Sequence, residues 1–338
     1  MKQLKTYSNA DVSQLFTIRA NETKWGQNIS FANSENWEEQ IQSEKFDYVI
    51  LGIAEDIGIR ANYGRAGARY TFEKILSSLL SIQSNRYIDT NKILILGQLE
   101  FNELYENIER KTISELRESV EQIDKLVFEL CYKIFAAGKK LIVVGGGHNN
   151  SYPLLMALSK SLGAKVNCLN IDAHSDFRIQ EGRHSGNGFR YAKENNYLNR
   201  YGIFGLHENY NSENILNEID QNPDLQYISL EDILIRKRYS IEHSLNSLVN
   251  FLIESPCALE FDMDSIQSMT SSAMSDTGFT FNEGRAIIHQ AASLLNPPYL
   301  HITEASSDLT QNQNELYLLQ KSIVYLISDF IKATQVDV

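Results

Sequence analysis

The chain has 338 residues, 43% hydrophobic and 22% charged, with a formal net charge of −12. This composition is ordinary for a globular protein with a large core. The negative charge argues against a nucleic-acid partner, because such binding depends on clustered Lys and Arg. No run approaches the roughly 20 apolar residues of a membrane span, and the N-terminus lacks a signal-peptide pattern. We therefore expect a cytoplasmic protein with no membrane partner.

Short apolar runs alternate along the chain with stretches of helical periodicity. Runs rich in Val, Ile and Leu predict buried strands at residues 48–53, 92–97, 140–146, 165–172, 201–206, 257–264 and 299–304. Apolar residues at helical spacing predict helices over residues 113–138, 242–253, 283–295 and 316–331. This alternation predicts a three-layer α-β-α fold with a doubly wound, mostly parallel sheet. We expect an N-terminal extension over 1–40 and a single domain over 41–338.

Polar side chains gather where three of these strands end. They are His148 in VVGGGHNN, Asp172, His174 and Asp176 in NIDAHSDFR, and Asp262 and Asp264 in EFDMDS. In open parallel sheets the ligand site lies outside the carboxyl ends of the strands. We expect Asp262 and Asp264 to point the same way because strand side chains alternate.

Each motif alone is typical of a helix cap or a turn, but together they indicate a metal centre. Four carboxylates and two imidazoles at one sheet edge would repel and lose hydration unless cations held them. A nitrogen and oxygen ligand set without thiolate suits manganese and related divalent ions. Six ligands fit two ions that share a carboxylate, and such a pair lowers the pKa of a shared water.

The motifs GGGH, DAHSD and DMD, in this order and at these separations, resemble those of the ureohydrolase family of arginases, agmatinases and formimidoylglutamases. The stretch ILGIAEDIGIRANYGRAGAR over 50–69 resembles the formimidoylglutamase branch. The resemblance implies an arginase-like fold and two Mn²⁺ ions. It implies that one ion is held by His148, Asp172, Asp176 and Asp262, and the other by His174, Asp172, Asp262 and Asp264.

The resemblance also implies roles around the metals. Asp264 would stabilise the tetrahedral intermediate, and Glu304 in ITEASSD would hold a cationic amidine. The segment SGNGFR over 185–190 matches a loop of the formimidoylglutamase branch, which makes Ser185 and Asn187 candidate substrate-binding residues.

Several positions depart from the arginase and agmatinase pattern. Gln267 and Ser268 stand where an Asp-Pro is expected, and Phe189 stands where arginases place a proton-shuttling His. His184 lies nearby, either as a substitute catalytic residue or as an exposed loop residue without a catalytic role. These departures keep a metal-binding but inactive relative among the alternatives.

Arg178 bears on the choice of substrate. Arginases have an Asn at the matching position, whereas an Arg suits a substrate with extra negative charge because it can bind a carboxylate bidentately. The alternative is a surface Arg. The expected reaction is hydrolysis of N-formimidoyl-L-glutamate to L-glutamate and formamide, with an arginase or agmatinase-type guanidino hydrolase as the alternative. The family resemblance further implies a homo-oligomer, a trimer or hexamer.

Overall fold

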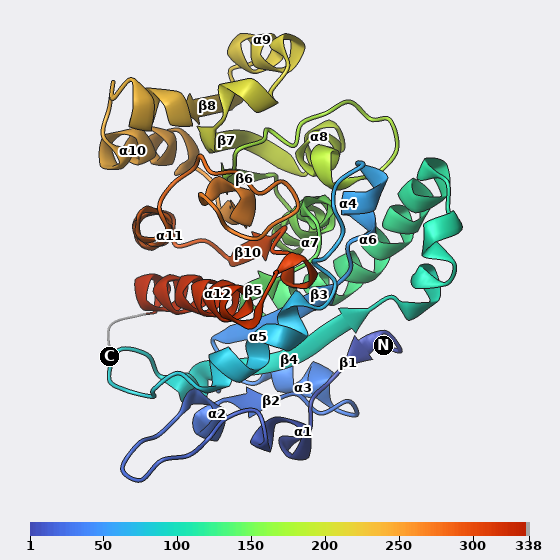
Figure 1. Ribbon diagram of the computed structural model, residues 1–338, viewed down its shortest axis with the longest axis vertical. Helices are drawn as coiled ribbons and strands as arrows, with labels where there is room; N and C mark the ends of the chain where they lie inside the picture. The colour runs from blue at the N-terminus through green and yellow to red at the C-terminus, as the bar shows by residue number, and fades with distance from the viewer. Residues whose placement is uncertain (336–338) are drawn as a thin grey trace.

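A computed structural model describes residues 1–335, and within them ten strands form one sheet (Figure 1). The strands are β1 (Leu4–Lys5), β2 (Ser30–Phe31), β3 (Tyr48–Ala54), β4 (Ile93–Glu100), β5 (Lys140–Val144), β6 (Val166–Ile171), β7 (Leu198–Leu206), β8 (Leu225–Ser229), β9 (Cys257–Asp262) and β10 (Tyr299–Thr303). Their order is β1-β4-β3-β5-β10-β9-β6-β7-β8, and β2 pairs with β4. Only the pairing of β1 with β4 is antiparallel among the strands of the described chain.

Helices cover both faces of the sheet. They are α1 (Asn9–Ser13), α2 (Trp25–Asn28), α3 (Trp37–Gln42), α4 (Ile57–Ala61), α5 (Thr71–Leu80), α6 (Ile113–Ala136), α7 (Ser151–Leu162), α8 (Gly188–Glu194), α9 (Glu213–Gln221), α10 (Ile241–Leu252), α11 (Phe281–Leu295) and α12 (Gln313–Thr334). The chain also forms short 3₁₀ turns next to these elements. Two of them precede helices, η4 (His148–Asn150) before α7 and η5 (Ser185–Asn187) before α8, and η8 (Met263–Ser265) follows β9. No helix within residues 1–335 is both long and apolar enough to cross a membrane.

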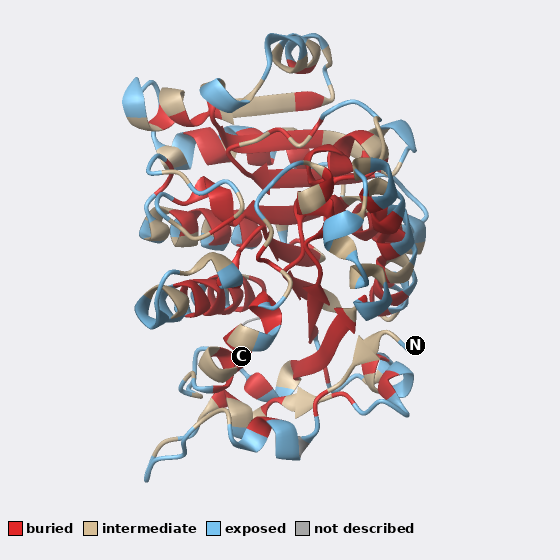
Figure 2. Ribbon diagram, turned by 45° about the vertical axis from the view of Figure 1, so that its right-hand side comes forward, coloured by how far each residue is buried: buried red, intermediate tan, exposed pale blue. Residues whose placement is uncertain are grey.

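The sheet divides the core into two apolar layers, because neighbouring strand residues face opposite sides. In β3, Ile50 packs into the layer under α5, α10, α11 and α12, whereas Val49 and Leu51 pack into the layer under α3, α6, α7 and α8. Figure 2 shows the central strands buried along their length, as expected for a sheet covered on both faces. The three-layer α-β-α fold expected from the sequence is confirmed.

Helix α6 begins where the sequence supplies a capping box. The Thr112 hydroxyl accepts a hydrogen bond from the Glu115 amide (3.3 Å), and the Glu115 carboxylate accepts one from the Thr112 amide (2.7 Å). The helix packs against α7 and carries the buried Asp124.

The topology brings the important strand ends together. Strands β5, β10, β9 and β6 are neighbours in that order, and all of them are parallel. The residues that follow them therefore meet at one edge of the sheet, as expected for an open parallel sheet. This edge carries the three predicted motifs.

All seven predicted strands are present, and each of the four predicted helices is found within three residues of its expected start. Sequence reasoning did not predict β1, β2 and β8, or helices such as α5 and α7. The residues before 41 pair with β4 through β1 and β2 and bury Trp25 and Trp37. A boundary near residue 40 stays a prediction.

Candidate metal centre

His148 stands on a loop that only small residues can form. Gly145 and Gly146 have φ values of 93° and 74°, which place both in the left-handed region that favours glycine. A side chain at Gly146 would also clash, since its Cβ would lie 2.8 Å from Glu55 Oε1. The loop then turns directly into η4 and α7, which leaves His148 fully buried at the tip.

The buried carboxylate of Glu55 organises this loop. Its Oε1 accepts hydrogen bonds from the Gly147 amide (2.9 Å) and from Asn150 Nδ2 (2.6 Å). Its Oε2 accepts from the amides of Ile57 (2.8 Å) and Gly58 (3.2 Å) at the start of α4. Burial raises the pKa of Glu55, although these hydrogen bonds oppose the shift. Glu55 therefore ties the His148 loop to α4.

Asp172, His174 and Asp176 lie in the loop that follows β6. Asp172 Oδ1 accepts a hydrogen bond from the His174 amide (2.7 Å), and Asp172 Oδ2 accepts one from Asn170 Nδ2 (3.0 Å). Asp176 has a φ of 45°, an uncommon conformation for a residue other than glycine. The strand therefore ends at Ile171, before Asp172, and the backbone leaves the extended conformation at Asp176.

Asp262 and Asp264 reach the same site for a reason other than the predicted one. Strand β9 ends at Asp262, and Asp264 lies in the turn η8, where strand alternation no longer applies. Asp262 Oδ1 accepts a hydrogen bond from the Asp264 amide (2.7 Å), which fixes the turn. The expectation of alternation is wrong, but both carboxylates are buried at this sheet edge.

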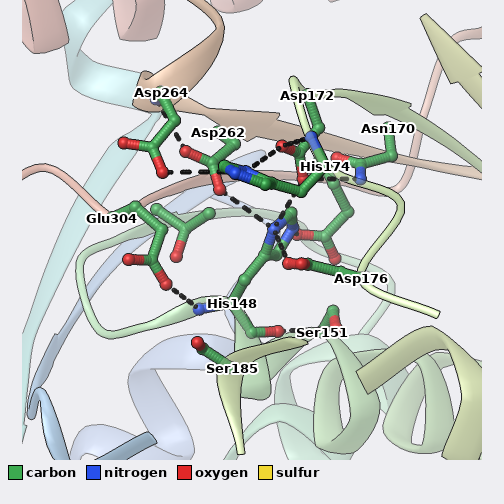
Figure 3. Close-up of polar contacts among 12 residues, drawn as sticks. His148, Ser151, Asn170, Asp172, His174, Asp176, Ser185, Asp262, Asp264 and Glu304 are labelled. Atoms are coloured by element: carbon green, nitrogen blue, oxygen red, sulfur yellow. Dashed lines mark hydrogen bonds and ion pairs between the residues drawn. The ribbon is translucent and has the colours of Figure 1, made fainter. Parts of the chain in front are cut away.

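Three carboxylates surround the Nδ1 atom of His148 (Figure 3). The distances from Nδ1 are 2.8 Å to Asp176 Oδ2 and 3.2 Å to both Asp172 Oδ2 and Asp262 Oδ2. One ligand atom from each of these four residues lies within 4.8 Å of all the others. This is the first of the two predicted ligand sets, and the structure brings it together.

The second predicted set is more open. His174 Nδ1 lies 3.5 Å from Asp172 Oδ1 and 3.9 Å from Asp264 Oδ2. The imidazole stacks on Tyr210 with 5.2 Å between ring centroids. His174 is partly exposed, with 28% of its side-chain surface accessible, whereas His148 is fully buried.

The carboxylates perturb one another and the imidazoles. Burial, together with the charges of Asp264 and Asp172, raises the pKa of Asp262 well above its usual range. Burial also opposes charge on Asp172, but its contacts with His148 and His174 hold the pKa of Asp172 below the usual value. Burial lowers the pKa of His174, but the contact with Asp172 raises it more strongly, so that the pKa is about 10.

These residues fit a divalent metal. His148 is fully buried, and three carboxylates that repel one another lie 2.8 to 3.2 Å from its Nδ1. Three carboxylates around one buried imidazole are costly unless a cation lies between them. Nitrogen and oxygen donors without thiolate suit manganese and similar ions.

Glu304 follows β10 and points toward the cluster. Its Oε1 accepts a hydrogen bond from the His148 amide (2.8 Å), while Oε2 is buried and has no partner in residues 1–335. Burial and the nearby charge of Asp264 raise the pKa of Glu304 to about 8. The residue also has a φ of 62°. A strained, buried carboxylate with a free oxygen is well suited to bind a cationic group.

The predicted substrate loop reaches the site, but its residues have different roles. Ser185 lies near His148 and Glu304 in Figure 3 and accepts a hydrogen bond from Asn62 Nδ2 (3.3 Å). The Asn187 side chain is used within the loop: Oδ1 accepts from the His184 amide (3.1 Å), and Nδ2 donates to the Gly182 carbonyl (2.8 Å). Ser185 is therefore the better candidate for substrate contact.

His184 is buried, so the alternative of an exposed loop histidine is wrong. Its Nδ1 accepts a hydrogen bond from the Gly186 amide (3.1 Å), and its Nε2 lies 3.3 Å from Glu181 Oε1. Burial, together with Arg117 and Arg178, lowers the pKa of His184 to about 4. With both nitrogens engaged, the neutral ring is placed to hold the loop rather than to carry protons.

Arg178 is about half exposed, with 51% of its side-chain surface accessible. Its guanidinium donates to Glu181 Oε1 (3.1 Å) and to Asn62 Oδ1 (3.4 Å). Ser185 contacts the same Asn62, so Arg178 lies at the edge of the substrate loop. A substrate carboxylate would have to compete with Glu181 for this side chain.

Sequence reasoning missed three buried residues near the centre, namely Glu55, Arg183 and Glu260. Glu260 accepts hydrogen bonds from Tyr299 (2.5 Å) and His301 (2.6 Å) and lies 3.6 Å from His148 Nε2. A signal was present, since Glu260 and His301 are charged or polar residues inside otherwise apolar strands. Such residues are rarely fully buried unless paired.

The raised pKa of His174 predicts how the metal-free protein responds to pH. Its folded-state pKa of about 10 exceeds the ordinary 6.5, so its contribution to stability is complete below pH 6.5 and is lost as pH rises toward 10. The pKa of Glu304 is also raised, from 4.5 to about 8, so its ionisation likewise lowers the stability of the folded protein as pH rises between these values. We expect the free energy of unfolding of the metal-free protein, measured in urea, to fall across this range.

Saturating Mn²⁺ should prevent this fall in the free energy of unfolding at high pH, because metals bind deprotonated ligands more tightly. A metal-free protein whose stability stayed constant or increased between pH 6.5 and 9 would contradict the assigned electrostatics.

Comparison with known proteins identifies the family. Residues 46–327 match the Arginase family. A formimidoylglutamase of Staphylococcus haemolyticus is 27% identical over 225 residues, which is 66% of this chain and 66% of that protein. One of Klebsiella pneumoniae is 31% identical over 145 residues, 43% of this chain and 41% of that protein. The match thus spans slightly less than two thirds of the length of the Staphylococcus protein and less than half of the length of the Klebsiella protein.

Solved structures agree on the fold. The formimidoylglutamase of Bacillus subtilis superimposes with a TM-score of 0.73 at 14% identity, covering 94% of this chain and 93% of that one. The formiminoglutamase of Trypanosoma cruzi with Mn²⁺ superimposes with a TM-score of 0.69 at 21% identity, covering 93% and 98%. With its sheet, its ligand cluster and a match over residues 46–327, this chain belongs to the arginase family.

Proposed function

We propose that this protein is a binuclear-metal hydrolase that cleaves a C–N bond of a linear amidine, converting N-formimidoyl-L-glutamate and water to L-glutamate and formamide. The observation that carries the proposal is the free, buried Oε2 of Glu304 beside the His148 cluster. It supports a substrate-binding role for Glu304, because a free carboxylate oxygen can bind a cationic amidine next to a candidate metal centre. The named relatives and structural neighbours, several of them formimidoylglutamases, support this choice of substrate.

The ligand sets fit two Mn²⁺ ions. His148, Asp172, Asp176 and Asp262 would hold one ion, and His174, Asp172, Asp262 and Asp264 would hold the other. The Trypanosoma cruzi neighbour was crystallised with Mn²⁺, which supports manganese over other divalent metals. When bound, such a pair lowers the pKa of water and supplies hydroxide at neutral pH.

The protein groups would bind and orient the amidine. Glu304 would accept hydrogen bonds from its nitrogens through Oε2, and the positive charge of the amidine would favour the ionised carboxylate, whose pKa is about 8 without a partner. The Ala273 amide donates to Asp264 Oδ1 (3.1 Å) and helps to hold this carboxylate, which would stabilise positive charge on the nitrogens of the tetrahedral intermediate. We assign no proton transfer to His184, because both of its nitrogens are engaged.

A guanidino substrate is the second candidate within the family. Arg178 distinguishes the two, since its guanidinium suits the additional carboxylate of formimidoylglutamate. Phe189, in place of a shuttle histidine, is fully buried and stacks on Tyr201 with 4.4 Å between ring centroids. It therefore leaves no titratable group at this position. A cytoplasmic location and a trimeric or hexameric assembly stay predictions from the sequence.

An assay of the manganese-loaded protein tests the function directly. We expect formamide release from formimidoylglutamate and no urea release from arginine or agmatine. Urea as the main product would favour the guanidino alternative. Failure to hydrolyse any amidine, with two ions bound, would favour a metal-binding but inactive relative.

Asp262→Asn should lower metal content and turnover together. The substitution removes a charge that both ligand sets share and keeps nearly the same side-chain volume. Metal content should be measured by mass spectrometry, together with formamide release. A variant that keeps two ions per chain and near-normal activity would show that Asp262 does not bridge.

Arg178→Ala should raise KM for formimidoylglutamate. Loss of a charge-assisted hydrogen bond typically costs about 1.5–3 kcal/mol, or on the order of ten- to a hundredfold. The loss should appear mainly in KM if the contact is equally strong in ground and transition states. Arg178→Lys should recover only part of the affinity, because an ammonium lacks the planar fork.

The matched control is Arg200→Ala, which also removes a partly exposed arginine paired with an acid, Glu254 at 2.8 Å. It should leave KM unchanged. Hydrolysis of a carboxylate-free amidine should barely respond to either substitution. Unaltered kinetics of Arg178→Ala on formimidoylglutamate would assign Arg178 to the surface alone.

A further inference from the structure

We propose that Arg183 is a positioning residue, whose buried guanidinium holds the substrate loop, residues 178–187, in register with the loop that carries His148. The proposal rests on the function proposed above, because it assigns the substrate contact of this loop to Ser185. The side chain lies between three parts of the fold that are distant in sequence, namely α6, η4 and η5. Figure 1 shows α6, α7 and α8 on the same side of the sheet.

All three nitrogens of the guanidinium donate hydrogen bonds, although the residue is only 1% exposed. Nε donates to Asp124 Oδ2 (2.8 Å), and one terminal nitrogen donates to Asp124 Oδ1 (3.3 Å). The same terminal nitrogen donates to the Asn149 carbonyl (2.7 Å), and the other donates to Asn187 Oδ1 (2.7 Å). The Tyr152 and Tyr191 rings each lie 4.8 Å from the guanidinium carbon. A lysine has three donors on one atom and cannot reproduce this planar arrangement.

Two of these partners are close to functional groups. Asn149 directly follows His148, so the bond to its carbonyl ties Arg183 to the candidate metal loop. Asn187 lies two residues after Ser185, and its orientation is fixed because a guanidinium can only donate, so the amide oxygen must face it. The fixed amide in turn supports the loop through the His184 amide and the Gly182 carbonyl.

The two loops are in close contact, so a small displacement of one changes the site. A Cβ added at Gly188 would lie 2.1 Å from Ser151 Oγ and 3.0 Å from the His148 carbonyl oxygen. Through its bonds to Asn149 and Asn187, Arg183 fixes the position of the substrate loop relative to His148. Loss of the guanidinium should therefore move Ser185 without removing any metal ligand.

A purely stabilising role is the alternative, and the chain offers a matched control. Arg285 on α11 makes the same paired contacts with Asp329 on α12, at 2.7 and 3.1 Å. Neither residue belongs to the candidate site. Arg183→Lys and Arg285→Lys keep the charge and leave no buried carboxylate without a cation, whereas Arg183→Met would leave Asp124 unpaired and risks unfolding.

The kinetic test is a double-mutant cycle on the manganese-loaded protein with formimidoylglutamate. We expect Arg183→Lys to raise KM about tenfold with metal content unchanged, and Arg285→Lys to leave KM unchanged. Ser185→Ala should raise KM by itself, and Arg183→Lys should add less than about twofold in that background, because interacting residues are not additive. Additive effects, or an unchanged KM for Arg183→Lys, would overturn the proposal.

Hydrogen exchange tests the positioning even if no amidine is hydrolysed, in which case only the proposed function fails. The Arg178 amide donates to the Gly186 carbonyl (3.0 Å), and the Gly186 amide donates to His184 Nδ1 (3.1 Å). Both amides should exchange at least about tenfold faster in Arg183→Lys and at the original rate in Arg285→Lys. Unchanged exchange in Arg183→Lys would overturn the role of Arg183.

Discussion

Buried and nearly buried carboxylates repel one another at the sheet edge where β6 and β9 end, because four of them meet there. Asp172, Asp176 and Asp262 all approach within 3.2 Å of His148 Nδ1, and Asp264 Oδ2 lies 3.9 Å from His174 Nδ1. Such a group cannot remain ionised in a low-dielectric interior without compensating charge. Protons supply part of this charge in the metal-free protein, as the raised pKa values of Asp262 and His174 indicate. Two divalent ions would supply it fully.

The surrounding structure holds these groups in place against their repulsion. Glu55 accepts hydrogen bonds both from the glycine loop and from the start of α4. Glu304 accepts a hydrogen bond from the His148 amide. Asp176 and Glu304 both have positive φ values, at 45° and 62°. Each such residue costs on the order of 1–3 kcal/mol, so the fold accepts strain at the site itself. Strain of this kind is typical of preorganised functional sites.

The candidate metal ligands could be predicted from the sequence because their signals are local. His148 follows three glycines, Asp172 and Asp262 directly end apolar runs, and the strand order brings these ends together. The alternation argument failed at Asp264 because β9 ends two residues earlier than the apolar run suggested. Strand ends depend on turn hydrogen bonds, such as that from the Asp264 amide to Asp262, which a periodic pattern does not encode.

The supporting residues were harder to predict because their contacts span long stretches of sequence. Glu55 and Gly147 are separated by 92 residues, and Arg183 and Asp124 by 59. Nothing in the local sequence near Arg183 distinguishes it from a surface arginine in a loop. The same limit applies to Asn187, whose predicted substrate contact depends on an amide that the structure shows bound within its own loop. Residues that act through others are visible only once the tertiary contacts are known.

We infer that this cluster holds two divalent ions. Anomalous diffraction at the manganese absorption edge, from crystals grown with Mn²⁺, would locate them. We expect two peaks, one bounded by His148, Asp172, Asp176 and Asp262 and the other by His174, Asp172, Asp262 and Asp264. Absence of manganese at both positions, or ions bound only elsewhere on the molecule, would contradict it.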